Sequence, residues 1–250
     1  MRGETDLLAA LLPQLGWADE RHVVETAEDD AETRRVAGNA NVHHHPLPQE
    51  ASFEDARAAA LPHIASDWVL VVDTDEVVTP SLARALRDRV DEWHGSGVAG
   101  VWLPRRNTVL DKPLAHSSAW PDYQLRMLRR DQLSYTPELH APAVVTGTTE
   151  RLPAADSCAI EHYPFRSTEQ YLDKLNRYSS LEARQQGADP GASPARAAAR
   201  AVRDFLARYV KMQGFRDGAV GLHYCVTMSA YRYLSEVKRW ELQHVKSQEP

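Results

Sequence analysis

The strongest constraint on the fold is the stretch Trp68–Thr79, in which an apolar run leads directly into an acidic cluster. Residues Trp68–Val72 are uninterrupted and mostly β-branched, which is typical of a strand buried on both faces in a parallel sheet. Asp73, Asp75 and Glu76 then fall at the carboxyl end of that strand, where open α/β sheets bind their ligands. Carboxylates with this spacing suit a hard divalent cation, which can in turn bind a phosphate.

A simpler explanation is an acidic turn before a helix. Thr79 and Pro80 make a good N-cap and first helical residue. They account for the start of a helix, but not for three carboxylates crowded just before it. The sequence therefore favours a metal site, with Asp73 and Asp75 as ligands.

Strand and helix patterns alternate on both sides of this stretch, which predicts a doubly wound α/β layer. The expected helices begin at Thr5 (ending at Gly16), near Ala31, at the capping box Ser52–Asp55 and after Thr79, and the expected flanking strands are 21–25 and 98–103.

Three consecutive histidines, His43–His45, lie in a segment rich in Pro and Asn that is predicted to be a loop. Three neighbours in one regular element cannot all reach one metal. They are therefore expected to be exposed loop residues, and metal binding by them is the weaker alternative.

The second half of the chain predicts a helical appendage. Ser167 and Gln170 form a capping box that opens a helix, and residues 185–194 have the composition of a linker. We therefore expect a domain over residues 1–184, a linker over 185–194 and amphipathic helices over 195–250.

The net charge of −6 argues against general nucleic-acid binding. Residues 1–60 carry five Arg and twelve acids, a net charge of −7, whereas residues 195–250 carry ten basic residues and five acids, a net charge of +5. The basic end would suit an anionic lipid or acceptor, or it is a solvated helix surface. Two cysteines and the lack of a signal peptide or long apolar segment predict a cytoplasmic protein.

Three segments in this order, Asp67–Glu76, Trp120–Arg130 and His162–Ser179, resemble family 2 glycosyltransferases. The nearest branch is the lipopolysaccharide inner-core β-1,4-glucosyltransferase type, and the resemblance runs from about Leu7 to Trp240. It implies a GT-A fold, a nucleotide-sugar donor (UDP-hexose, with glucose as the first expectation), Mg²⁺ or Mn²⁺, and inversion at the anomeric carbon. The implied acceptor is a glycan or glycolipid.

The resemblance also implies roles for single residues. Asp73 and Asp75 match the pair that meets the metal, the diphosphate and the ribose, and Asp122 matches the catalytic base. His140 matches a histidine near the donor phosphates and is a candidate metal or phosphate ligand. Arg126 and Arg129 are candidate phosphate clamps, with surface ion pairs as the alternative.

The donor pocket departs from the family pattern. Members of the family begin with a strand before the helix that starts here at Thr5. Their acidic motif after the second strand is replaced by Glu25–Asp30. Within this segment, Glu25 and Asp30 remain candidates for binding the nucleobase and the ribose of the donor. Ala141 follows His140, where the family often has Glu. Either the start codon is placed too late, or donor binding is altered or lost.

Three functions are compatible with these patterns. The first is an inverting glycosyltransferase, with its basic C-terminal helices in peripheral contact with the inner face of the plasma membrane. The second is a non-catalytic GT-A-like domain with a degraded donor pocket. The third is a nucleotidyltransferase, which the motif at Trp120–Arg130 and the helix after Ser167 disfavour.

Overall fold

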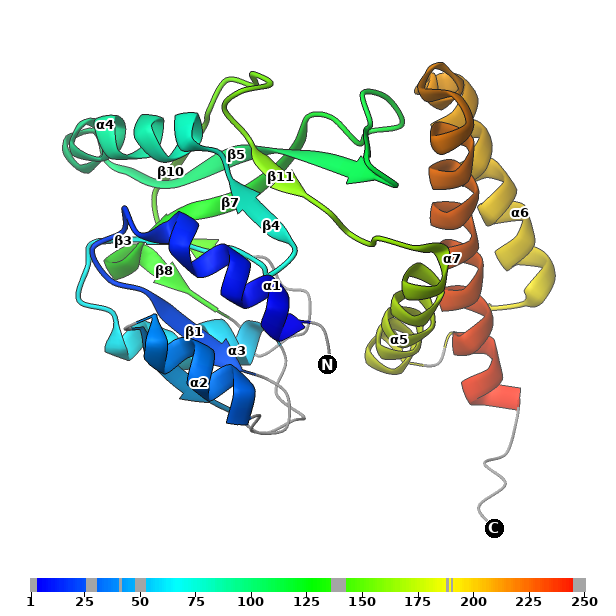
Figure 1. The fold of residues 1–250 in the computed structure, drawn as a ribbon. Coiled ribbons are helices and arrows are strands. Elements are labelled where there is room, and N and C mark those ends of the chain that lie inside the picture. Colours follow the sequence, from blue (N-terminus) through cyan, green and yellow to red (C-terminus); the bar gives the residue numbers. More distant parts are fainter. Residues whose placement is uncertain are drawn as a thin grey trace, which may run out of the picture. The chain divides into compact units, whose positions relative to one another are not determined.

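The structure is a computed structural model that describes residues 4–25, 31–40, 42–47, 53–135, 143–187, 189 and 191–244 (Figure 1). It is an α/β protein, as predicted. Its contacts divide it into two compact units, which are treated separately below. Unit 1 comprises Met1–Arg105 and Tyr123–His162, and unit 2 comprises Arg106–Asp122 and Tyr163–Pro250.

The helices and strands have the following bounds. The α-helices are α1 (Glu4–Leu11), α2 (Ala31–Asn39), α3 (Phe53–Ala60), α4 (Pro80–Ser96), α5 (Thr168–Gln186), α6 (Pro194–Leu206) and α7 (Gly218–His244). The strands are β1 (His22–Glu25), β2 (His43–Pro46), β3 (Trp68–Leu70), β4 (Glu76–Val78), β5 (Val98–Val109), β6 (Lys112–Pro113), β7 (Asp122–Arg129), β8 (Leu133–Ser134), β9 (Val144–Val145), β10 (Thr148–Arg151) and β11 (Ile160–His162). Shorter helical turns are Leu12–Leu15, Leu61–His63, Arg130–Gln132, Ala207–Lys211 and Gly214–Asp217.

The main sheet is mixed rather than parallel. Its strand order is β3-β7-β5-β11-β4, with β10 and β6 also paired to β5. The predicted strand after residue 67 is confirmed as β3, but it runs antiparallel to β7 and its three side chains are half-buried. An apolar run indicates burial but not the direction of the partner strand, so the prediction of a parallel, fully buried strand was wrong.

The prediction of a loop at the three histidines is also wrong. Residues His43–Pro46 form strand β2, which pairs in parallel with β1 in a separate two-stranded sheet. The His43 N–H donates to the Arg21 carbonyl at 2.9 Å, and the Leu47 N–H donates to the Glu25 carbonyl at 2.9 Å. The composition of the segment could not reveal this pairing, because the neighbouring strand supplies the hydrogen bonds. Among the described residues, no strand joins β1 to the main sheet.

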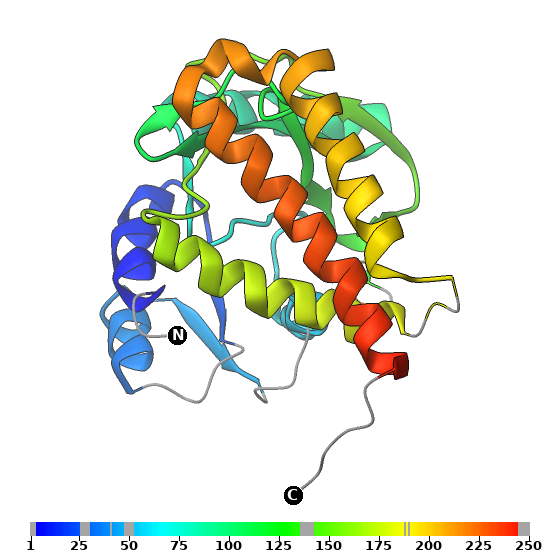
Figure 2. The same cartoon turned by 90° about the vertical axis from the view of Figure 1, so that its right-hand side faces the viewer.

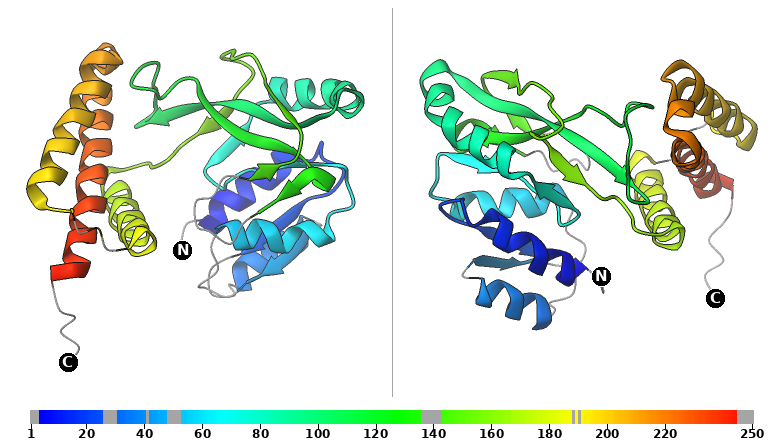
Figure 3. Two further views of the ribbon diagram at one scale, coloured as in Figure 1. Left: turned by 180° about the vertical axis from the view of Figure 1, so that it is seen from behind. Right: turned by 45° about the horizontal axis from the view of Figure 1, so that its top comes forward.

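Helix α4 forms the core of unit 1 against the main sheet. It begins as predicted, because the Leu82 N–H donates to the Thr79 side chain at 3.3 Å, and it ends at Gly97 in the left-handed conformation, with φ 76°. Figures 1 and 3 show the helix running along the sheet. Fully buried side chains on its inner face pack against strand residues, namely Leu82, Leu86 and Trp93 against Val101, Leu103 and Ile160. Burial of each such large apolar side chain stabilises the fold by about 1.5–3 kcal/mol.

Unit 2 is built around α7, which contacts both α5 and α6 (Figure 2). The predicted helix start at Ser167 is confirmed, because the Gln170 N–H donates to the Ser167 hydroxyl at 3.1 Å. Tyr171 of α5 donates its hydroxyl to the Thr227 carbonyl of α7 at 2.7 Å. Helix α5 thus belongs with the C-terminal helices, whereas the sequence grouped it with residues 1–184. The predicted capping residue Ser52 lies outside the described residues.

A buried carboxylate anchors the start of α7 within unit 2. Asp217 is 4% exposed and accepts hydrogen bonds from the backbone N–H groups of Ala115 and His116, at 3.3 and 2.9 Å. Its carboxylate also lies 2.9 Å from His116 Nδ1. None of the helices in the described part of the chain combines the length and apolarity that a membrane span requires.

Candidate functional site

The predicted acidic cluster of unit 1 forms a tight turn between β3 and β4. The Glu76 N–H donates to the Asp73 carbonyl at 3.0 Å, and the Asp73 N–H donates to Glu76 Oε2 at 3.1 Å. Glu76 is completely buried, so its carboxylate serves the turn and not the solvent. These two hydrogen bonds hold Asp73, Asp75 and Glu76 in a fixed conformation.

Three arginines from separate elements neutralise two of these carboxylates. Arg126 of β7 contacts Asp73 Oδ2 and lies 2.7 Å from Glu76 Oε1, and Arg105 of β5 lies 3.0 Å from the same Glu76 oxygen. Arg57 of α3 lies 3.3 Å from Asp73 Oδ1. Burial raises the pKa of the Asp73 carboxyl, but Arg126 and Arg57 outweigh burial and hold that pKa below its ordinary value. Asp73 is therefore ionised at neutral pH.

The structure places the two predicted phosphate clamps in ion pairs within the protein. Arg126 is 6% exposed, and its charge is shared between Asp73 and Glu76. Arg129 lies 3.0 Å from Asp131 and donates to the His94 carbonyl at 3.5 Å. Residues three apart on a strand point to opposite faces, so β7 does not bring these two guanidinium groups together. Their role toward a donor phosphate stays a prediction.

Asp75 has a histidine partner whose role the sequence left open. His162, the last residue of β11, is paired in register with Glu76 of β4, and its Nε2 lies 3.7 Å from Asp75 Oδ1. The side chains of His162 and Asp75 are 15% and 19% exposed, so both retain contact with solvent. The antiparallel pairing of β11 with β4 is what brings the histidine to the acidic turn.

This arrangement suits a divalent cation at Asp75 better than at Asp73. Both Asp73 oxygens contact guanidinium groups, which would repel a cation beside them. Asp75 and His162 offer a carboxylate oxygen and an imidazole nitrogen, a donor pair that fits Mn²⁺ more readily than the strictly oxygen-ligated Mg²⁺. The third predicted ligand, His140, lies outside the described residues.

The predicted base Asp122 belongs to unit 2 and is half-buried at the start of β7. Asn107 Nδ2 donates to Asp122 Oδ2 at 3.3 Å and to the Ala119 carbonyl at 3.0 Å. Asn107 is itself 6% exposed, so its amide is well placed to orient the carboxylate. The sequence did not identify Asn107 as a partner, since it reads as an ordinary turn residue.

Glu25 and Asp30 are the residues predicted to bind the nucleobase and the ribose, and the structure describes the first of them. Glu25 is the last residue of β1, is 7% exposed and lies 2.9 Å from His44 Nε2. Its carboxylate thus has a protein partner in β2. Asp30 lies outside the described residues. The role of Glu25 toward a nucleobase stays a prediction.

Comparisons with known proteins give distant structural matches. No family model matches the chain. It is similar to a mycobacterial protein of known structure at 17% identity and a TM-score of 0.42, over 76% of this chain and 73% of that one. It is also similar to TarS from S. aureus at 13% identity and a TM-score of 0.45, over 96% of this chain and 53% of that one. A structure of TarS 1–349 matches with the same identity and TM-score, over 100% of this chain and 91% of that one. Matches at these values do not by themselves identify an activity.

Proposed function

We propose that this protein is an inverting, metal-dependent glycosyltransferase of the GT-A type. It would transfer a hexose from a nucleotide sugar to a hydroxyl of a glycan or glycolipid. The observation that supports this most is the acidic turn Asp73–Glu76, which the buried Arg126 helps to hold in place while Asp75 faces His162. A turn fixed in this way suits a cation that binds a diphosphate. The resemblance of three sequence segments to family 2 glycosyltransferases points to the same chemistry.

Asp75 and His162 are the proposed metal ligands, and Asp73 fixes the turn through its arginine partners. The bound cation would act as a Lewis acid that neutralises charge developing on the leaving diphosphate. The donor we propose is a UDP-hexose, with UDP-glucose as the first candidate.

Asp122 is the proposed base. It would take the proton from the acceptor hydroxyl as that oxygen attacks the anomeric carbon on the face opposite the diphosphate. The hydrogen bond from Asn107 keeps one carboxylate oxygen in a fixed orientation, so that less reorientation is needed when the proton moves.

Asp75→Asn tests the metal site. The substitution preserves the shape of the side chain but removes the charge that binds the cation, so we expect UDP-dependent Mn²⁺ affinity to fall at least about tenfold, an energy of roughly 1.4 kcal/mol. The measurement is the EPR signal of free Mn²⁺ with and without UDP. The matched control is Asp91→Asn, which removes an exposed carboxylate from α4 and should leave the affinity unchanged. Equal Mn²⁺ binding by wild type and Asp75→Asn would exclude Asp75 as a ligand.

The C-terminal helices are the proposed membrane contact. Val202 and Leu206 of α6 and Val210 in the following turn are each more than half exposed, at a spacing of four residues. The arginines of α6 add positive charge to the same helix. An apolar stripe with basic neighbours suits an anionic bilayer surface. We expect the wild-type protein to co-sediment with anionic liposomes. The double variant Val202→Ser with Leu206→Ser should co-sediment much less. Wild-type protein that stays wholly in the supernatant would contradict the membrane contact.

A further inference from the structure

A second cluster of metal-ligating side chains lies in unit 1, away from the acidic turn in sequence. The parallel pairing of β1 with β2 places His22 directly opposite His43 in the register. Paired residues of neighbouring strands point to the same face of a sheet, and strands lie about 4.8 Å apart, so the two imidazoles are neighbours. Their ring centroids are 4.7 Å apart. Glu20 is two residues before His22, so its side chain turns to this face as well.

The carboxylate and the two imidazoles converge. Ligand atoms of Glu20, His22 and His43 all lie within 4.8 Å of one another. Glu20 Oε2 is 3.2 Å from His22 Nε2. Two ligands of a tetrahedral Zn²⁺, each bonded at about 2.1 Å, are roughly 3.4 Å apart, so this pair needs almost no movement. His43 is exposed and can turn its ring toward the other two.

Two of the three ligands are held in place by neighbours. Glu20 Oε1 accepts hydrogen bonds from the backbone N–H groups of Ala65 and Ser66, at 2.9 and 2.6 Å, which leaves Oε2 facing His22. His22 Nδ1 is 3.0 Å from His45 Nε2. A metal-bound histidine usually donates its other ring N–H to a neighbouring acceptor, and His45 is placed to accept it.

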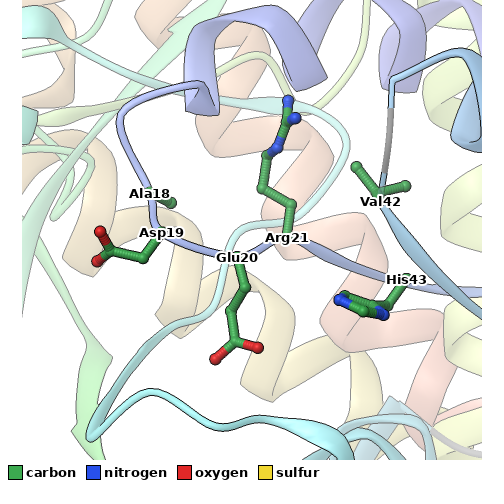
Figure 4. Close-up of a pocket in the computed structure, with 6 residues that line it drawn as sticks. All are labelled: Ala18, Asp19, Glu20, Arg21, Val42 and His43. Atoms are coloured by element: carbon green, nitrogen blue, oxygen red, sulfur yellow. The ribbon is translucent and has the colours of Figure 1, made fainter.

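Solvent and ions can reach the cluster. A cavity of about 280 Å³ is lined by Ala18, Asp19, Glu20, Arg21, Val42 and His43 (Figure 4). Figure 4 shows the Glu20 and Arg21 side chains pointing to opposite sides of the backbone. Arg21 donates instead to the carbonyls of Leu12 and Ala40, at 3.1 and 2.7 Å, so its positive charge is directed away from the carboxylate.

We propose that Glu20, His22 and His43 form a Zn²⁺-binding site that links β1 to β2. Two imidazoles and one carboxylate are a common ligand set for zinc, in which a water molecule or small anion takes the fourth position. The site has two imidazole ligands where the pair at Asp75 has one, and the greater share of nitrogen favours Zn²⁺ here. His44, on the opposite face of β2, pairs with Glu25 and takes no part. The proposal does not require three consecutive histidines to share one metal, because its ligands come from two strands.

Calorimetric titration of the chelator-treated full chain with Zn²⁺ tests the site. In the absence of nucleotide we expect one tightly bound Zn²⁺, with affinity reduced at least about tenfold in His43→Ala and in Glu20→Gln. His43 is exposed, so its loss should not unfold the protein, and Gln at position 20 keeps an oxygen for the two backbone N–H groups. Circular dichroism of each variant checks the fold.

Two controls separate this site from other histidines and from the acidic turn. His94→Ala removes an exposed histidine from α4, and Asp75→Asn removes the ligand proposed for Mn²⁺. Each of these two variants should bind Zn²⁺ with the affinity of the wild type. Bound Co²⁺ should give the visible absorption of a four-coordinate ion in the wild type and lose it in His43→Ala. A wild type that binds no Zn²⁺, or unchanged affinity in both His43→Ala and Glu20→Gln, would overturn the proposal.

Discussion

Replacement of Asp122 by asparagine is expected to lower the turnover number about 10²- to 10⁴-fold while the affinity for UDP stays within about twofold of the wild type. Asparagine retains an oxygen that can accept the hydrogen bond from Asn107, so the local structure should survive. It cannot take a proton from the acceptor hydroxyl, so only the chemical step suffers. The measurement is the rate of UDP release from UDP-glucose, with binding of UDP measured separately.

Asp111→Asn is the matched control for this substitution. Asp111 is an exposed carboxylate in the same unit, and its left-handed backbone, with φ 60°, is one that asparagine tolerates. Turnover should therefore be unchanged. An Asp122→Asn variant that keeps more than about a third of the wild-type rate would show that Asp122 is not the general base, because the smallest expected effect is about 10²-fold.

Replacement of Arg126 by methionine should lower the free energy of unfolding by about 3–5 kcal/mol, the usual effect of removing one partner from a buried ion pair. Arg126 is 6% exposed and contacts Glu76, which is completely buried. Without Arg126, the guanidinium groups that remain in the described ion pairs are that of Arg105 for Glu76 and that of Arg57 for Asp73. Urea denaturation followed by circular dichroism measures the change, provided that the dependence on urea concentration stays the same.

Arg129→Met is the control, since it removes the same group from the same strand. Its partner Asp131 is 57% exposed, so the loss should be below about 1 kcal/mol. A double-mutant cycle with Glu76→Gln isolates the Arg126–Glu76 interaction. Because Glu76→Gln removes the uncompensated charge, the double variant should lose less than the sum of the single losses. An Arg126→Met variant within about 1 kcal/mol of the wild type would contradict the buried network.

The starts of α4 and α5 were predictable because their determinants are local. Thr79 and Ser167 each cap a helix through a backbone N–H three residues later, and both pairs are visible in the sequence. The pairing of the strands was harder to predict. The antiparallel pairing of β3 with β7 and the strand at His43–Pro46 both depend on partners from elsewhere in the chain.

In the candidate site, too, the features set by local sequence were predictable and the contacts between distant residues were not. The cluster of Asp73, Asp75 and Glu76 was predictable from spacing alone. Its arginine partners were not, because the contacts span 16 residues for Asp73 with Arg57, 29 for Glu76 with Arg105 and 50 for Glu76 with Arg126. The pairing of Asp75 with His162 likewise depends on the register of β11 with β4. The sequence therefore predicts the carboxylates, and only the fold shows which of them the arginines occupy.

The cluster of Glu20, His22 and His43 was not predicted for the same reason, since it depends on strand pairing. Consecutive residues on a strand alternate between faces, so His43–His45 alone cannot surround a metal. The parallel register with His22 supplies the second imidazole, and the segment just before β1 supplies Glu20. No local pattern in the sequence predicts that combination.

Calorimetric titration of the wild-type chain with UDP, in Mn²⁺ and then in EDTA, tests the central claim most directly. The proposed glycosyltransferase should bind UDP in the presence of Mn²⁺ and bind it at least about tenfold more weakly in EDTA, because Asp75 and His162 would hold a cation that neutralises charge on the diphosphate. Folded protein that binds no nucleoside diphosphate under either condition would contradict the proposal and indicate a GT-A-like domain without a working donor pocket.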